Sequence, residues 1–230
     1  MIAWIRTLIF RVVFYGVSVF IVGTVPVSAL FGQRAVIVHS TVWTVFHRWM
    51  ARLILGVRVR IEGTRPEGPV LYAAKHQAMF ETLELQGRLD GPAMVLKEEL
   101  ADIPVWGWAA RQYGALVIDR SASATALRQM MREGKAAKAA GRSVLIFPEG
   151  TRVKPGETPP LKSGFAGLYR ALAMPTVPIA LDSGILMPKT GAKHPGTITI
   201  RYGEVIPPGL SREEIDARVH AAINVLETRS

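Results

Sequence analysis

The chain of 230 residues contains no cysteine. That absence excludes disulfide scaffolds, thiolate metal sites, covalent haem attachment and every mechanism with a cysteine nucleophile. Charged residues are also scarce, at 20% of the chain against roughly 25% in an average soluble domain. Hydrophobic residues make up 49%, so we expect one domain of ordinary size that contacts more than water.

Several catalytic patterns are missing as well. No Gly-x-Ser-x-Gly elbow exposes a serine nucleophile, which disfavours a covalent acyl-enzyme. The five histidines lack the helical spacing of paired metal ligands, and there is no Walker-type phosphate loop. We therefore expect neither a metal site nor a bound cofactor. Acid/base chemistry and anion binding remain.

Acidic residues are absent before Glu62, whereas the same segment holds seven arginines and no lysine. The net charge of the chain is +10, which suits phospholipid head groups, phosphorylated substrates or nucleic acid. Nucleic acid is the least favoured of these partners, because the arginines concentrate in an apolar segment instead of a soluble patch with stacking aromatics.

Residues 12–33 form a run of 22 uncharged residues, about 33 Å long as a helix and close to the roughly 30 Å of a bilayer core. Pro26 inside this run predicts a bend or a break, and a second apolar run follows at residues 35–55. One spanning helix and a helical hairpin within one leaflet fit this pattern equally well. Either arrangement predicts attachment to a negatively charged leaflet.

Two other interpretations of the N-terminus stay open. Small residues at 27–29 resemble the cleavage site of a signal peptide, although the chain beyond them stays apolar. A wholly buried core helix is the other, but its arginines would need acidic partners that the segment itself lacks.

After position 56, short β-branched runs alternate with helical stretches. Strands are predicted at residues 57–61, 70–74, 93–96, 116–118, 143–147, 176–181 and 197–202. Helices are predicted at 81–88, 105–113, 124–140, 165–173 and, after a capping box, 211–228. The pattern indicates an α/β fold with a mostly parallel mixed sheet of about seven strands covered by helices. We expect residues 1–56 to form a membrane-associated helical pair and residues 57–230 to form the α/β domain.

His76 follows the strand predicted at 70–74, and Glu81 comes five residues later. The two side chains would not face each other on a straight helix, but they can meet if His76 lies in the turn before it. The carboxylate would then fix the imidazole tautomer and leave the other ring nitrogen as a base for a substrate hydroxyl or water. A histidine capping a helix beside a surface glutamate is the alternative.

Cationic residues follow three other predicted strands: Arg152, Arg120 and Lys97. Active sites of open α/β sheets lie beyond the carboxyl ends of the strands, where the planar donors of Arg152 suit a phosphate. A tight turn with a solvated arginine, or a surface pair between Asp119 and Arg120, would explain such a segment alone. Four strand ends that each supply a cation or the base together indicate a site for an anionic substrate.

Four motifs occur in order along the chain. His-x4-Glu spans 76–81, Gly-x-x-x-Ile-Asp-Arg spans 114–120, Phe-Pro-Glu-Gly-Thr-Arg spans 147–152 and Val-Pro-Ile spans 177–179. In this order they resemble the glycerolipid acyltransferase family, specifically the bacterial 1-acylglycerol-3-phosphate acyltransferases. The third motif is highly specific, and the likeness covers about residues 40–205.

This resemblance implies transfer of a fatty acyl group from acyl carrier protein or coenzyme A to the free hydroxyl of lysophosphatidic acid, which gives phosphatidic acid. It implies that His76 is the general base and that Glu81 orients it. The implied phosphate site comprises Arg152, Glu149, Gly150, Thr151, Arg120 and Lys97, and the implied acyl channel comprises Val177, Pro178 and Ile179. The implied location is the cell inner membrane, with the active site on the cytoplasmic side.

Glu81 departs from the family, which usually has Asp at this position. The extra methylene keeps the charge but changes the reach of the carboxylate. Two alternatives therefore stay open: an acyltransferase for another lysolipid acceptor, and a non-catalytic basic membrane-binding protein on the same scaffold. The sequence leaves open the donor carrier, the acyl chain length and the oligomeric state.

Overall fold

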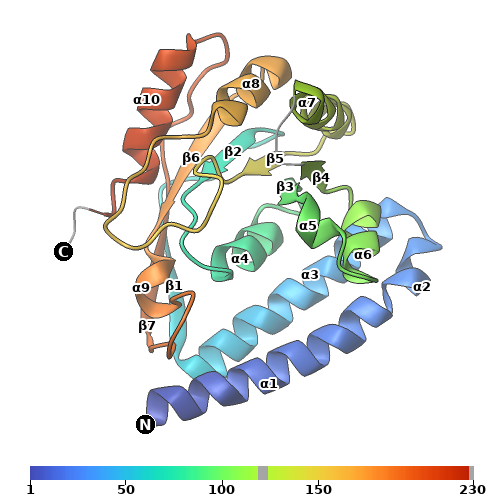
Figure 1. Cartoon of the computed structure of the whole chain (residues 1–230), viewed down its shortest axis with the longest axis vertical. Coiled ribbons are helices and arrows are strands. Elements are labelled where there is room, and N and C mark those ends of the chain that lie inside the picture. The colour runs from blue at the N-terminus through green and yellow to red at the C-terminus, as the bar shows by residue number, and fades with distance from the viewer. Residues whose placement is uncertain (119–123, 228–230) are drawn as a thin grey trace.

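A computed structural model describes residues 1–118 and 124–227 of the chain (Figure 1). Its centre is a seven-stranded sheet in the order β1-β7-β6-β2-β5-β3-β4. The strands are β1 (Val57–Glu62), β2 (Leu71–Ala74), β3 (Ala93–Lys97), β4 (Leu116–Ile118), β5 (Val144–Ile146), β6 (Thr176–Leu181) and β7 (Gly196–Tyr202). Each lies where the sequence predicts a strand, so the predicted α/β sheet is confirmed.

Most neighbouring strands of the sheet are parallel. β2 pairs with β5 and β6, and β3 pairs with β4 and β5, all in parallel. β7 is antiparallel to β6 and parallel to β1, which makes the sheet mixed. The five strands β2 to β6 therefore run in one direction, and their carboxyl ends meet at one edge of the sheet. The segments that leave this edge after β2 and β5 hold His76 and Arg152.

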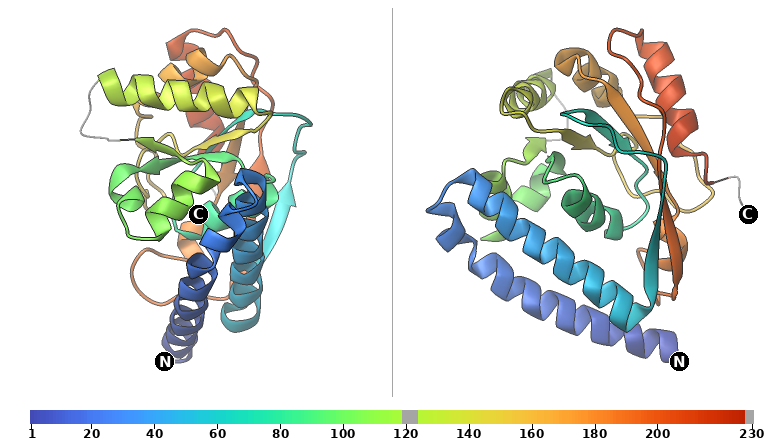
Figure 2. Two further views of the ribbon diagram at one scale, coloured as in Figure 1. Left: turned by 90° about the vertical axis from the view of Figure 1, so that its right-hand side faces the viewer. Right: turned by 180° about the vertical axis from the view of Figure 1, so that it is seen from behind.

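Helices cover both faces of the sheet (Figures 1 and 2). One face carries α7 (Ala124–Ala139), α8 (Ser163–Leu172) and α10 (Arg212–Ile223). The other face carries α4 (Phe80–Arg88), whose Leu85 packs in the same buried cluster as Tyr72 and Ile179. Burial on both sides explains why the strands have nearly continuous apolar sequences, and all six residues of β6 are buried.

The predicted helices are present, with differences at their ends. α6 (Trp106–Tyr113) lies as predicted, and α10 starts with the predicted capping box, in which Ser211 Oγ accepts a hydrogen bond from the Glu214 N–H. The predicted end of α10 at 228 is wrong: the helix ends at Ile223, because Asn224 turns its side chain to the His220 carbonyl and to another segment. The sequence predicts neither α5 (Glu98–Ala101) nor α9 (Ser183–Leu186), since helices of four residues show no periodicity.

The N-terminus forms a helical hairpin along the lower side of the molecule in Figure 1. It consists of α1 (Ile2–Gly23), α2 (Val25–Ala29), α3 (Gln33–Met50) and a π-helical turn, η1 (Ala51–Leu55). The helix is interrupted at Thr24, so that Pro26 stands in the first turn of α2, where its missing N–H costs nothing. Gly32, with a φ of 85°, precedes α3 in the turn that reverses the chain. The predicted helical pair is confirmed, while the division into two domains at residue 56 stays a prediction.

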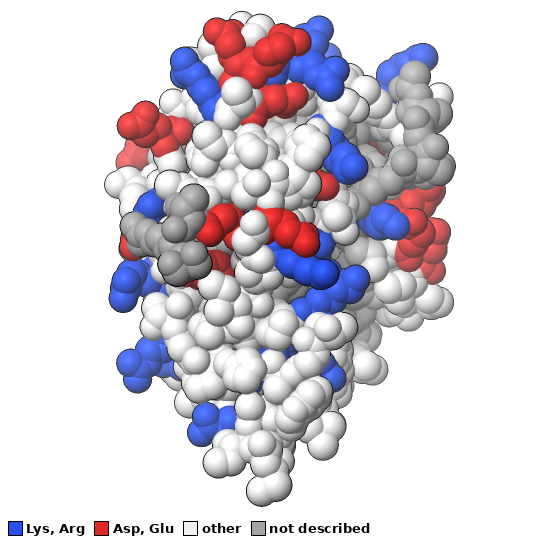
Figure 3. Space-filling view, turned by 60° about the vertical axis from the view of Figure 1, so that its left-hand side comes forward, with Lys and Arg blue, Asp and Glu red and all other residues white. Residues whose placement is uncertain are grey.

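The outer side of the hairpin is apolar. The segment Ile2–Ala29 contains a window of 18 residues with a mean hydropathy of 2.1, and only 22% of that window is buried. Leu8, Val12 and Phe20 of α1 are among its large exposed side chains. The lower part of Figure 3, where these helices lie, is mostly white with scattered blue and no red. The length and composition of the segment suggest membrane association.

The inner side of the hairpin packs on the α/β domain. Phe10 and Phe14 of α1 lie in one buried cluster with Phe80, the first residue of α4. Glu84 of α4 is fully buried and pairs with Nε of Arg48 on α3 at 3.0 Å. A buried carboxylate is stable only with such a partner, so this contact fixes the hairpin against α4.

Gly87 marks a close approach of α3 and α4. A Cβ atom at this position would overlap Oγ1 of Thr44 and lie 3.0 Å from its Cβ. Gly16 on α1 offers the opposite case, because a Cβ there would meet nothing within 4 Å.

We expect Gly87→Ala to destabilise the protein by about 1–3 kcal/mol, because overpacking outweighs the better helix propensity of alanine. Gly16→Ala makes the same change where there is room, and it should stabilise the helix by up to about 1 kcal/mol. Denaturant unfolding in detergent micelles measures both variants. Equal effects of the two substitutions would contradict the packing argument.

Candidate active site

His76 lies in the turn that joins β2 to α4, at the carboxyl edge of the sheet. Its Nδ1 atom is 2.9 Å from Oε1 of Glu81, the second residue of α4. The turn thus brings together two side chains that a continuous helix would separate. The contact that the sequence analysis expects is present, and the catalytic role of the pair stays a prediction.

The carboxylate of Glu81 is fully buried and accepts further hydrogen bonds. Its Oε1 accepts from the backbone N–H groups of Gln77 at 2.5 Å and of Ala78 at 2.6 Å. Its Oε2 accepts from the hydroxyl of Ser183, the first residue of α9, at 2.6 Å. A carboxylate only accepts, so Nδ1 of His76 is assigned as a donor, which leaves Nε2 of the neutral ring as an acceptor.

The turn also accommodates the extra methylene of Glu81. The side chain reaches back to the N–H groups of the turn just before α4. Glutamate at this position therefore holds the backbone of the turn and the imidazole at once. The departure from the Asp of the family motif leaves the contact with His76 intact.

The segment after β5 holds His76 from its other side. The ring of Phe147 stacks on the imidazole, with 4.2 Å between the centroids and 24° between the planes. The backbone N–H of His76 donates to Oε2 of Glu149 at 2.9 Å, and its carbonyl accepts from the N–H of Val153 at 2.7 Å. The His76 side chain keeps 16% of its surface exposed, so the ring is fixed and still accessible.

Lys75, the residue before His76, is completely buried. Its ammonium group donates to Oε1 of Glu149 at 2.7 Å, to Oδ1 of Asn224 at 2.7 Å and to the carbonyl of Glu157 at 2.8 Å. Burial raises the pKa of the Glu149 carboxyl, and the hydrogen bonds from Lys75 and from the N–H of His76 oppose that shift. Both oxygens of Glu149 are thus engaged inside the protein, where they brace the turn that carries His76. The part of Glu149 in phosphate binding stays a prediction.

A second contact ties the C-terminal segment to the same turn. Nε2 of Gln77 donates to Oε1 of Glu227 at 2.6 Å, and Oε1 of Gln77 accepts from the N–H of Gly184 at 2.9 Å. The other carboxylate oxygen of Glu227 accepts from the N–H of Gly156 at 2.5 Å. The turn that carries His76 is therefore held by residues from four separate parts of the chain.

Gly150, Thr151 and Arg152 continue the segment after β5. Gly150 has a φ of 71° and approaches the side chain of Lys162. Thr151 and Arg152 are exposed, and no carboxylate in the described ranges lies within ion-pair distance of the Arg152 guanidinium. The N–H of Val153 donates to the carbonyl of His76, so Arg152 is next in sequence to a residue that contacts the candidate base.

The remaining cations of the predicted phosphate site are Lys97 and Arg120. Lys97 ends β3 and forms an exposed ion pair with Glu99 at 2.6 Å. Arg120 falls outside the described residues. The parts of Lys97 and Arg120 in phosphate binding stay predictions.

Val177, Pro178 and Ile179, predicted to shape the acyl channel, lie in β6 at the centre of the sheet. Val177 and Ile179 are fully buried in the cluster beneath α4, and Pro178 approaches Gly203. Their part in an acyl channel also stays a prediction.

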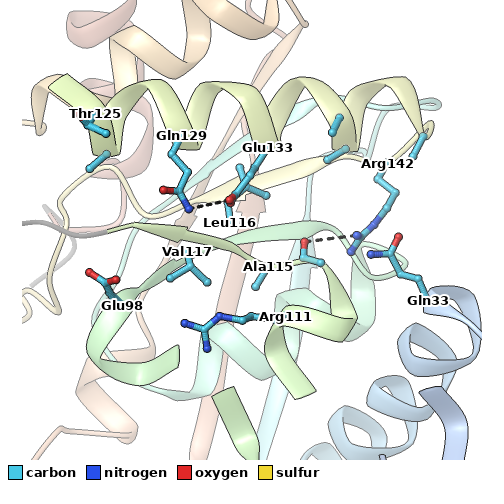
Figure 4. Close-up of a pocket in the computed structure, with 15 residues that line it drawn as sticks. Gln33, Glu98, Arg111, Ala115, Leu116, Val117, Thr125, Gln129, Glu133 and Arg142 are labelled. Atoms are coloured by element: carbon cyan, nitrogen blue, oxygen red, sulfur yellow. Dashed lines mark hydrogen bonds between the residues drawn. The ribbon is translucent and has the colours of Figure 1, made fainter. Parts of the chain in front are cut away.

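Two cavities lie away from the turn that carries His76. The larger is an open groove of about 610 Å³ between the edge strand β4 and α7, lined by Arg111, Gln129, Glu133 and Arg142 among others (Figure 4). A smaller one of about 90 Å³ lies between the hairpin and α6 and is lined mainly by apolar residues such as Val25 and Trp106. Neither is lined by His76, Glu81 or Arg152, so the candidate site rests on side-chain geometry. Among residues 1–118 and 124–227, no group of three or more His, Asp or Glu side chains could hold a metal.

Comparisons with known proteins identify the family of the chain. The model of the family described as Acyltransferase matches residues 56–182 of the chain, which is more than half of its length. The chain belongs to this acyltransferase family. The matched region includes the turn that carries His76, the exposed Arg152 and the strand β6.

Individual relatives extend the likeness. The chain is 34% identical to a 1-acyl-sn-glycerol-3-phosphate acyltransferase of Pseudomonas aeruginosa, over 96% of this chain and 86% of that one. It is 36% identical to a lyso-ornithine lipid O-acyltransferase of the same organism, over 45% of this chain and 40% of that one. The crystal structure of PlsC, the 1-acyl-sn-glycerophosphate acyltransferase of Thermotoga maritima, has the same fold, with a TM-score of 0.79 and 21% identity over 99% of this chain and 97% of that one.

The Lys75–Glu149 pair generates a stability prediction. We expect Lys75→Met to destabilise the protein by about 3–5 kcal/mol, because it leaves the Glu149 carboxylate buried without its cation. Lys97→Met breaks an ion pair of similar length that is exposed, and it should cost about 1 kcal/mol or less. Chemical unfolding of both variants in detergent micelles tests the difference, and equal losses would refute the bracing role.

Proposed function

We propose that this protein transfers a fatty acyl group from an acyl thioester to the sn-2 hydroxyl of lysophosphatidic acid, which gives phosphatidic acid. The observation that carries the proposal is the contact between His76 and Glu81, in which a buried carboxylate orients an accessible imidazole. The name of the Pseudomonas aeruginosa relative, matched over nearly the full chain, supports the acceptor.

The chemistry follows from the assigned tautomer. Nε2 of His76 takes the proton from the acceptor hydroxyl while the oxygen attacks the thioester carbonyl. A C–O bond forms and the C–S bond breaks, and the imidazolium returns its proton to the departing thiolate. Glu81 stabilises the imidazolium through Nδ1 and is not itself protonated. No covalent acyl-enzyme is required.

Arg152 supports the choice of a phosphorylated acceptor. Arg152 precedes Val153, whose N–H donates to the His76 carbonyl. Its planar guanidinium is exposed and has no carboxylate partner among the described residues, so it is available for two parallel hydrogen bonds to a phosphate. In this proposal Gly150, Thr151 and Glu149 shape the same turn, Lys97 and Arg120 add positive charge, and residues 177–179 border the acyl chain.

The membrane supplies the acceptor. A tail of about fifteen methylenes, at about 0.8 kcal/mol each, would cost on the order of 12 kcal/mol to draw fully into water. The apolar outer side of the hairpin allows the site to work at the lipid surface instead. We propose the cytoplasmic side of the inner membrane as its location.

A different lysolipid is the second candidate acceptor. It is favoured by the 36% identity to the lyso-ornithine lipid enzyme, although that likeness covers less than half of the chain. The same imidazole would activate any hydroxyl held beside it.

Purified protein incubated with a labelled acyl thioester and a set of lysolipids tests both candidates. Acyl carrier protein and coenzyme A thioesters are supplied separately, so that the donor is identified in the same assay. We expect labelled phosphatidic acid as the main product. Preference for another lysolipid would support the second candidate, and no product with either donor would indicate a non-catalytic membrane-binding protein.

We expect His76→Ala to lower turnover by roughly 10²–10⁴-fold, equivalent to about 3–5 kcal/mol, because the step loses its base. The variant should stay folded and membrane-bound. His220→Ala removes a half-buried histidine of α10, whose Nε2 lies 3.1 Å from the carbonyl of Thr158, and should leave turnover unchanged. Nearly normal turnover of His76→Ala would remove it from the mechanism.

Arg152→Ala should raise KM for lysophosphatidic acid at least tenfold and leave KM for the acyl thioester within about twofold. Arg170→Ala, an exposed arginine at the end of α8, serves as the control. Steady-state kinetics with each substrate varied in turn measures the effect. If Arg152→Ala raised both KM values equally, Arg152 would have a structural role instead.

A further inference from the structure

The loop between α9 and β7 is pinned to the N-terminal helix α1. The backbone N–H of Lys193 in this loop donates to Oγ1 of Thr7 at 2.8 Å, and Nη2 of Arg11 donates to the carbonyl of Gly191 at 3.5 Å. At its start the loop follows α9, whose Ser183 bonds to Glu81. The loop therefore runs from the candidate catalytic pair to the hairpin.

The same side of α1 also faces the catalytic turn. Residues four apart lie on one face of a helix, so Thr7, Arg11 and Tyr15 share a stripe. The hydroxyl of Tyr15 lies 3.9 Å from the sulfur of Met79, which stands between His76 and Glu81 in the sequence. This stripe of α1 thus borders both the loop and the turn that holds the candidate base.

Lys193 is half-buried where this loop meets α1, and it has no acidic partner among the described residues. Its ammonium lies 3.4 Å from the carbonyl of Pro188, and no carboxylate of the described residues is within ion-pair distance of Lys193 or Arg11. Burial lowers the pKa of the Lys193 ammonium, and the positive charges of Arg11 and Arg152 lower it further. Arg11 on α1 and Arg152 after β5 thus both repel the Lys193 ammonium.

We propose that Lys193 and Arg11 bind the phosphate monoester of the acceptor together with Arg152. A phosphate monoester carries about −1.5 to −2 charges at neutral pH and would relieve this repulsion. Lysine binds phosphate as a point charge, whereas the two arginines can offer paired donors. The inference deepens the proposed function, because it assigns two further binding residues to the same site.

Arg11 gives this site its link to the membrane. It lies at the boundary between the buried side of α1, which holds Thr7 and Phe14, and the neighbouring side that exposes Leu8, Val12 and Val19. An acceptor whose tail stays among the lipids would therefore present its phosphate to a residue of the helix that touches those lipids. The loop around Lys193 would close over the phosphate from the domain side.

Kinetics of matched lysine variants tests the inference. Lys193→Gln should raise KM for lysophosphatidic acid at least tenfold, with KM for the acyl thioester within twofold, and Lys193→Arg should recover most of the loss. Lys189→Gln removes the same charge from an exposed position of the same loop and should leave both KM values unchanged. Arg11→Gln should act as Lys193→Gln does, whereas Arg34→Gln on α3 should not.

An equilibrium measurement separates this inference from the proposed reaction. The probe is a lysophosphatidic acid analogue without the sn-2 hydroxyl, which cannot react, and glycerol 3-phosphate serves as the soluble phosphate. We expect Lys193→Gln and Arg11→Gln to weaken binding of the lipid probe at least tenfold, and glycerol 3-phosphate to compete only weakly. Equal competition by glycerol 3-phosphate would mean that the site takes free phosphate esters and would overturn the link to the membrane.

Losses no larger than those of Lys189→Gln and Arg34→Gln would overturn the inference even if the wild-type protein makes phosphatidic acid. Conversely, a wild-type protein that makes no phosphatidic acid but binds the probe through Lys193 and Arg11 would refute the proposed function alone. Should Lys193→Gln not fold, Arg11→Gln and Lys193→Arg still decide the outcome.

Discussion

The carboxylate of Glu81 is the interaction on which the candidate site depends. It receives donors from the imidazole of His76, from two backbone N–H groups of the turn and from Ser183 on a different strand connection. Fully removed from water, this charge would be unstable without those donors. The same bonds that stabilise it therefore fix the tautomer of His76, the start of α4 and the start of the loop that leads to Lys193.

Much of this arrangement follows from sequence because it depends on local patterns. Short runs of three to six residues rich in β-branched side chains mark all seven strands, and the parallel direction of β2 to β6 brings their carboxyl ends to one edge. The meeting of His76 and Glu81 also follows, once the turn before α4 is recognised. Short helices such as α9 and the end of α10 do not follow, since a single turn has no periodicity and Asn224 ends its helix through a tertiary contact.

The contacts that brace the turn of His76 do not follow from the sequence, for a different reason. Lys75 and Glu149 are far apart in the chain and belong to segments that look solvated, yet both are buried against each other. Nothing in the local sequence of Lys193 or Arg11 indicates that the loop of Lys193 binds α1 beside Arg11. Their approach depends on how the hairpin packs on the domain, through Phe10, Phe14 and Phe80, and that packing is a property of the whole fold.

The bond between Lys75 and Asn224 has a consequence for how the protein is made. The two residues are 149 positions apart, and Gln77 is bound to Glu227 over a similar span. The hairpin precedes α10 along the chain, so it leaves the ribosome before that helix does. The contacts that hold the turn of His76 are then completed only after α10 and the segment up to Glu227 have been synthesised.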